Sequence, residues 1–105
     1  MRSISRIILA GCLLLPSLSS CSSVTPHENF KSHMNRNVGK SIDDPETNWV
    51  NPQVFIESNV LPNGNIENKY RFRGTCRYFF EIDPKTRKIV EWRFEGSERD
   101  CEIVP

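Results

Sequence analysis

Alternation of apolar and charged residues between positions 66 and 95 constrains the fold of this chain more than any other feature. The apolar set of one parity is Ile66, Tyr70, Phe72, Cys76, Tyr78, Phe80, Ile82, Val90, Trp92 and Phe94. The opposite parity carries Glu67, Lys69, Arg71, Arg73, Arg77, Glu81, Asp83, Glu91, Arg93 and Glu95. A period of two is that of a strand with one buried face. The pattern therefore predicts an antiparallel meander that is apolar on one side and charged on the other.

The charges predict the register of the last two strands. If Phe80 lies opposite Trp92, then Tyr78 faces Phe94, Phe79 faces Arg93 and Arg77 faces Glu95. A shift by two residues would set Arg77 against Arg93, and like charges directly opposite each other are destabilising. We therefore expect the first register, in which Val90, Trp92 and Phe94 all point inward.

A further strand and turn precede this block. Val54-Phe55-Ile56 and Val60-Leu61 indicate a strand, and Pro62-Asn63-Gly64-Asn65 indicates a hairpin turn. Because Asn-Gly tolerates positive φ, we expect a type I′ turn there. The turn-rich stretch from Lys40 to Pro52 is predicted to be a loop whose Ile42 and Trp49 reach the core.

A single helix is expected from Pro26 to Val38. Thr25 and Glu28 have capping-box spacing, and Pro26 suits the first helical position. Phe30, Met34 and Val38 recur every four residues and form one apolar stripe, and Gly39 supplies the stop. The predicted fold class is α+β: an N-terminal helix packed on a three- to four-stranded antiparallel meander, a two-layer sandwich with one disulfide.

The first twenty residues have the form of a targeting segment. Arg2 and Arg6 precede an apolar run, Ile7–Leu15, that is too short to span a bilayer. Leu18-Ser19-Ser20-Cys21 then resembles the lipobox of bacterial lipoproteins. That resemblance implies a signal peptide over residues 1–20, a lipid (palmitate-bearing) anchor on Cys21, a tether over 21–25 and one domain over 26–105. The alternative is an ordinary secretory signal that is cleaved near the same small residues.

The resemblance also implies a location. Ser22, rather than Asp, after the lipidated cysteine favours the outer membrane, on its periplasmic side. Removal of residues 1–20 takes away two arginines and leaves a net charge of −1, which argues against a nucleic-acid partner. With Cys12 removed and Cys21 acylated, the remaining pair, Cys76 and Cys101, is predicted to form a disulfide in the oxidising periplasm.

No residue pattern indicates catalysis, a cofactor or a metal site. His27 and His33 lie six positions apart and share no helix face well. Asp43, Asp44 and Glu46 lack the spacing of an EF-hand, and Cys76 and Cys101 belong to no CxxC motif. We therefore expect a non-enzymatic protein without cofactor or metal.

Phe79 is a large apolar residue at a position where the pattern calls for charge. We favour a stack of its ring against Arg93, since cations commonly cover aromatic faces. The other interpretation makes Phe79 the anchor of a partner-binding face. The remaining members of that candidate face are Arg71, Arg73, Arg77 and Arg93.

The overall layout resembles the small outer-membrane lipoproteins of the SmpA/OmlA type, which includes the BamE-like proteins. The shared features are a lipidated cysteine, a striped helix running into Val38-Gly39, and a meander with late Phe80 and Trp92. The resemblance implies helices packed on a three-stranded sheet and a role as an envelope-assembly accessory. A second helix before Gly39 is missing, and the paired cysteines and residues 96–105 lie outside the pattern.

The expected function is that of a membrane-anchored periplasmic lipoprotein that acts through contacts with a protein partner in the envelope. The alternative is a periplasmic inhibitor or ligand-binding module, because small disulfide-closed sheets also serve in that role.

Overall fold

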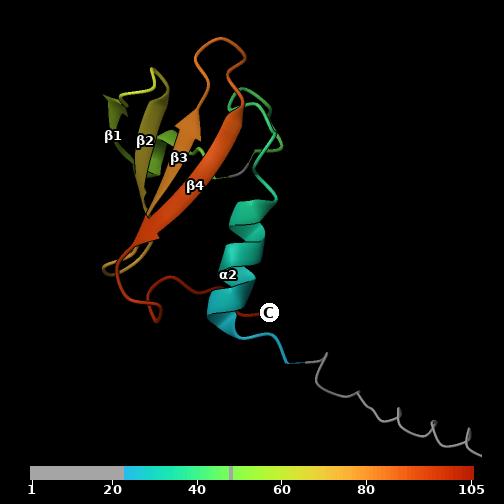
Figure 1. Ribbon diagram of the computed structural model, residues 1–105. Helices are drawn as coiled ribbons and strands as arrows, with labels where there is room; N and C mark the ends of the chain where they lie inside the picture. Colours follow the sequence, from blue (N-terminus) through green and yellow to red (C-terminus); the bar gives the residue numbers. More distant parts are fainter. Residues whose placement is uncertain (1–22, 48) are drawn as a thin grey trace, which may run out of the picture.

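The computed structural model describes residues 23–47 and 49–105, which form one helix beside a four-stranded antiparallel sheet (Figure 1). The elements are α2 (Pro26–Asn35), the 3₁₀ turn η2 (Pro52–Val54), β1 (Phe55–Val60), β2 (Ile66–Arg71), β3 (Arg77–Ile82) and β4 (Ile89–Glu95). The strands lie in chain order, which confirms the predicted α+β meander. The predicted signal peptide and the lipidation site at Cys21 lie outside the described residues.

Helix α2 begins with the predicted capping box but ends earlier than expected. The Thr25 hydroxyl accepts the Glu28 amide at 3.1 Å, and the Glu28 carboxylate accepts the Thr25 amide at 3.3 Å. The helix ends at Asn35. The next turn is closed by hydrogen bonds between residues three apart, such as Val38 N–H to Asn35 O, and not four apart as in an α-helix. Val38 is therefore 42% exposed, so its predicted place in the buried stripe is wrong.

The register between β3 and β4 is the predicted one over most of its length. Tyr78 pairs with Phe94, Phe80 with Trp92, and Arg77 with Glu95. A bulge at Ile82 then sets that residue opposite Ile89 and reverses the parity at the start of β4. As a result Ile89 is buried, while Val90, predicted to point inward, is 41% exposed.

The β1–β2 hairpin exists, but its turn is not type I′. The Gly64 amide donates to the Leu61 carbonyl at 2.9 Å, and Gly64 has a φ of +89°. Asn63 is not among the residues with positive φ, whereas a type I′ turn requires positive φ at both central positions. Pro62 at the first central position, with φ fixed near −65°, instead suits a type I turn followed by a left-handed glycine.

The core lies between the inner face of the sheet, α2 and the loop before η2. Phe30 of α2 packs against Phe72, Trp92 and Phe94, with ring centroids 5.7 to 6.1 Å away. The Trp92 indole donates to the Asn35 side chain at 2.7 Å, which fixes the end of the helix over β4. The predicted loop residues, Ile42 and Trp49, pack against the same core.

The C-terminal tail is tied both to the sheet and to the helix. Cys76 and Cys101 form the predicted disulfide, with their Cα atoms 5.2 Å apart. Beyond it, the Ile103 amide donates to Pro26 O at 3.0 Å, and the Asn29 amide group donates to Ile103 O at 3.1 Å. The tail therefore ends beside the start of α2, as Figure 1 shows.

Candidate functional site

The candidate site is the outer face, the side of the sheet turned away from α2. Strand pairing arranges its side chains in three rows across β2, β3 and β4. We call them the acidic row, the central row and the basic row. Their members, in that order, are Glu67, Glu81 and Glu91; Lys69, Phe79 and Arg93; and Arg71, Arg77 and Glu95.

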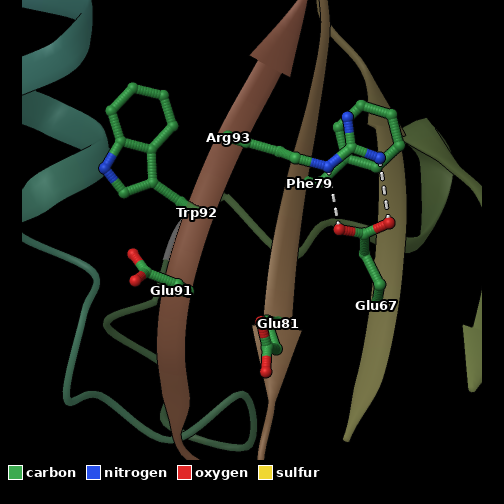
Figure 2. A pocket seen from close by; sticks show the side chains of 6 residues that line it. All are labelled: Glu67, Phe79, Glu81, Glu91, Trp92 and Arg93. Atoms are coloured by element: carbon green, nitrogen blue, oxygen red, sulfur yellow. Dashed lines mark hydrogen bonds and ion pairs between the residues drawn. The ribbon is translucent and has the colours of Figure 1, made fainter. Parts of the chain in front are cut away.

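Phe79 in the central row is covered by cations. Figure 2 shows the Arg93 side chain over Phe79, and its guanidinium lies 3.7 Å from the centre of the ring. The Lys69 ammonium lies 5.6 Å from the same point. The side chain is consequently only 5% exposed. This arrangement is the stack we favoured from the sequence, and it leaves the ring little surface for a partner while Arg93 is in place.

Arg93 is held over the ring by two carboxylates. It donates to both oxygens of Glu67, at 2.9 and 3.0 Å, and to Glu95 at 3.1 Å. The hydrogen bonds to Glu67 are the main reason that the pKa of Arg93 is raised above its ordinary value. Such a two-point arginine–carboxylate pair has a defined geometry as well as charge attraction, so the cover over Phe79 is oriented.

The acidic row keeps an ionised glutamate at its centre. The Glu81 carboxylate accepts the side-chain amides of Asn63 at 3.0 Å and Asn65 at 2.7 Å, which lowers its pKa. Glu91 is exposed and forms no ion pair within residues 23–47 and 49–105. Figure 2 shows Glu81 and Glu91 on neighbouring strands. Both line a small hollow of about 50 Å³.

The basic row ends the face at the opposite side from the acidic row. Arg71 lies directly opposite Arg77, a like-charge neighbour. Arg77 donates to the carbonyls of Gly74 at 2.9 Å and Cys76 at 2.8 Å, and within the described part of the chain neither arginine has a carboxylate partner. Glu95 lies opposite Arg77 but pairs with Arg93. The outer face is therefore acidic at one end, and at the other it carries two guanidinium groups that form no ion pair among the described residues.

The structure separates Arg73 from the other predicted face residues. Arg73 follows the end of β2, and it donates to the Arg99 carbonyl at 3.2 Å and to Glu102 at 3.3 Å. Arg71, Arg77, Phe79 and Arg93 are brought together on the sheet, whereas Arg73 joins the β2–β3 turn to the tail. Sequence parity cannot predict this bond, because it depends on where the disulfide leaves the tail.

His27 and Asp43 both make contacts within the fold. A ring nitrogen of His27 lies 2.7 Å from Cys101 O, and Asp43 pairs with Arg87 at 2.7 Å, which lowers the pKa of Asp43. No cluster of potential metal ligands occurs in the part of the chain that the structure covers. Within the same residues, no helix is both long and apolar enough to cross a membrane.

A second candidate site, missed from the sequence, lies on the inner face beneath β1 and β2. Two hollows of about 280 and 230 Å³ adjoin there and share Ile42, Ser58, Asn68 and Arg87. They exist because α2 covers the sheet beside β4 and leaves the β1 side to the loop (Figure 1). The sequence feature that could have indicated this site is Asn68, a polar residue at an inward position. Its side chain donates to Tyr70 Oη at 3.1 Å.

Comparisons with known proteins test whether this arrangement belongs to a described family. Neither the protein-family models, nor the curated proteins, nor the solved structures contain a match to this chain. The likeness to SmpA/OmlA-type lipoproteins therefore stays a prediction from layout, and the geometry of the outer face carries the functional argument.

Proposed function

We propose that this protein is a non-enzymatic lipoprotein, anchored on the periplasmic side of the outer membrane, that acts by binding another envelope protein through its outer face. The observation that carries the proposal is the separation of charge on that face. Among residues 23–47 and 49–105, Arg71 and Arg77 form no ion pair at one end of the face, and Glu91 forms none at the other. Charge patterns of this kind steer and orient a complementary protein partner.

The proposed anchor is supported by the chain on both sides of Cys21. The lipobox precedes it, and the capped helix begins only five residues later, at Pro26. An extended link of that length reaches about 13–17 Å, so a lipid on Cys21 would hold the domain close to the headgroups. The Cys76–Cys101 disulfide agrees with an oxidising compartment such as the periplasm.

The experiment reverses charge at the basic row in the full-length protein. Arg71→Glu is made beside Lys85→Glu, a matched control in the exposed β3–β4 turn. Each tagged protein is cross-linked in intact cells, purified from membranes and analysed by quantitative mass spectrometry. We expect one envelope protein to be recovered with the wild type and with Lys85→Glu, and at least about tenfold less of it with Arg71→Glu. Equal recovery with both variants would contradict a contact at the outer face.

The anchor has a separate test. Cys21→Ala removes the acylated sulfur, and we expect the protein to move from the membrane fraction to the soluble periplasmic fraction. Retention in the membrane after this change would remove the lipoprotein part of the proposal and leave the contact face untouched.

A ligand-binding module is the second candidate, and the inner-face hollows favour it. Together they offer the volume of a small-molecule site. Ser58→Phe would fill the shared part, and Val90→Phe on exposed β4 serves as the control. If a fluorescent apolar probe such as 1-anilinonaphthalene-8-sulfonate binds there, the first variant abolishes binding and the second does not. Equal binding by both variants excludes the hollows as the site.

A further inference from the structure

We infer that strand β1 is an interface between two copies of this chain, which pair edge to edge in an antiparallel register centred on Ser58. This interface is distinct from the outer face of the proposed function. β1 ends the sheet, and among the described residues its only backbone partner is β2. All six of its residues are exposed.

Within the part of the chain that the structure describes, the backbone of β1 has hydrogen-bonding groups that β2 does not use. The Leu61 amide donates to Asn65 O at 2.8 Å, and on the other side of β2 the Phe72 amide donates to Cys76 O at 3.1 Å. Hydrogen-bonded and non-bonded pairs alternate along an antiparallel ladder. In this register Ser58 and Val60 therefore direct their N–H and C=O groups away from β2, toward the free edge.

Among the described residues, the edge carries few of the devices that usually prevent pairing, and its one bulge lies at the start of the strand, between Phe55 and Glu57. Proteins commonly blunt an edge strand with lysine, proline or a covering loop. β1 contains neither residue, and its only charge is Glu57. Ile56 is 40% exposed and Val60 is 77% exposed, so the edge presents apolar surface as well as free backbone groups. By contrast, the start of β4 is covered, because Gly39 and Lys40 bond to Ile89.

The sequence of β1 is complementary to itself, and this identifies the occupant. When Ser58 faces Ser58 of the second copy, Ile56 faces Val60, and Glu57 faces Asn59. Apolar residues thus meet apolar ones, and an amide donor meets the carboxylate. A register shifted toward the start of the strand sets Glu57 against Glu57, a like-charge clash. A shift the other way leaves Ile56 without a partner.

The geometry of the pairing defines a two-fold axis. Antiparallel strands that continue one sheet are related by a rotation about an axis normal to that sheet, and such a symmetric contact is the commonest way in which identical chains associate. The axis passes between the two Ser58 residues. The bulge between Phe55 and Glu57 limits the paired segment to about Ile56–Val60.

Disulfide trapping in cells tests the register. In a hydrogen-bonded antiparallel pair the Cα atoms are about 5.5 Å apart, which lies within the range of a disulfide. We expect Ser58→Cys, made in the full chain, to give a disulfide-linked dimer of twice the monomer mass. Val90→Cys, at an exposed position on the opposite edge, is the matched control and should remain monomeric. The native Cys76 and Cys101 are fully buried and joined to each other, so they do not compete.

Sedimentation of the full-length protein in a neutrally buoyant detergent tests the association itself. Wild type should sediment as a reversible dimer. Val60→Lys should raise the dissociation constant of the dimer at least about tenfold, because this change sets a lysine against Ile56 of the second copy. Val90→Lys should have the same dissociation constant as wild type. The inference is overturned if wild type is monomeric throughout, if both lysine variants behave alike, or if Ser58→Cys is trapped only with a different protein.

Discussion

The guanidinium of Arg93 lies 3.7 Å from the centre of the Phe79 ring and is held there by both carboxylate oxygens of Glu67. The pair explains how a phenylalanine can occupy a charged face and remain 5% exposed. It also means that this part of the outer face presents an ion-pair network and not an aromatic ring.

This relationship predicts the effect of Arg93→Ala. The change removes the cation above the ring and leaves Glu67 without its partner, so we expect a loss of about 1–2 kcal/mol of unfolding free energy. Urea denaturation measures it, and Arg87→Ala is the control, because the Arg87–Asp43 ion pair is solvent-exposed and is expected to contribute less to stability. Equal losses in the two variants would show that the stack on Phe79 contributes nothing measurable.

Reduction of the Cys76–Cys101 disulfide should destabilise the domain strongly. The bond closes a loop of sequence separation 25, for which the chain-entropy relation gives about 3–4 kcal/mol. Guanidinium denaturation of the oxidised protein, the reduced protein and the Cys76→Ala/Cys101→Ala double variant provides the comparison. We expect the last two to unfold at similar, much lower denaturant concentrations. An unchanged midpoint after reduction would refute this prediction.

Gly96→Ala should be more damaging than Gly64→Ala, although both glycines have positive φ, at +107° and +89°. A Cβ at Gly96 would collide with the Thr75 carbonyl, whereas a Cβ at Gly64 meets nothing within 4 Å. We expect about 1 kcal/mol of backbone strain in Gly64→Ala and a loss larger by about 1–3 kcal/mol in Gly96→Ala. Thermal unfolding of the two variants decides the matter, and equal melting temperatures would argue against the close approach.

The stability of the tail should depend on pH through Asp100. Its carboxylate accepts the Thr75 amide and hydroxyl, both at 2.7 Å, and these bonds lower its pKa below the ordinary 3.8. A carboxyl group with a lowered folded-state pKa contributes stability that is present above pH 3.8 and is lost as the pH falls through the folded-state value.

Asp100→Asn should therefore unfold with a weaker dependence on pH below about 4 than wild type. Denaturation midpoints measured at several acidic pH values test this, with Glu98→Gln, a nearby exposed carboxylate, as the control. A pH profile that is the same in Asp100→Asn and wild type would show that the Thr75 contacts do not affect titration.

Alternation and charge predict the sheet because both act between neighbouring strands. The Arg77–Glu95 and Phe80–Trp92 pairs follow from parity and from avoiding one like-charge contact. The prediction that Val90 points inward is wrong, because a bulge inserts one residue and exchanges the faces of Ile89 and Val90. One sign of the bulge is present in the sequence, because Ile89 is an apolar residue with the parity of the charged face.

The candidate site could be predicted only in part. The stack of Phe79 on Arg93 follows from the register, but the positions of Arg73 and of the inner-face hollows do not. Arg73 depends on a tail that reaches it through a disulfide, and the hollows depend on how far α2 extends across the sheet. Both are contacts between segments distant in sequence, which no local pattern encodes.

The contacts between the C-terminal tail and the start of α2 have a mechanical consequence. A pulling force that enters the domain at Thr25 meets the tail at once, through Pro26 with Ile103 and His27 with Cys101. From Cys101 the load passes through a covalent bond into Cys76, just before the central strand β3. Tension on the N-terminal side is thus shared with the sheet, and α2 is not the sole element that must resist unravelling.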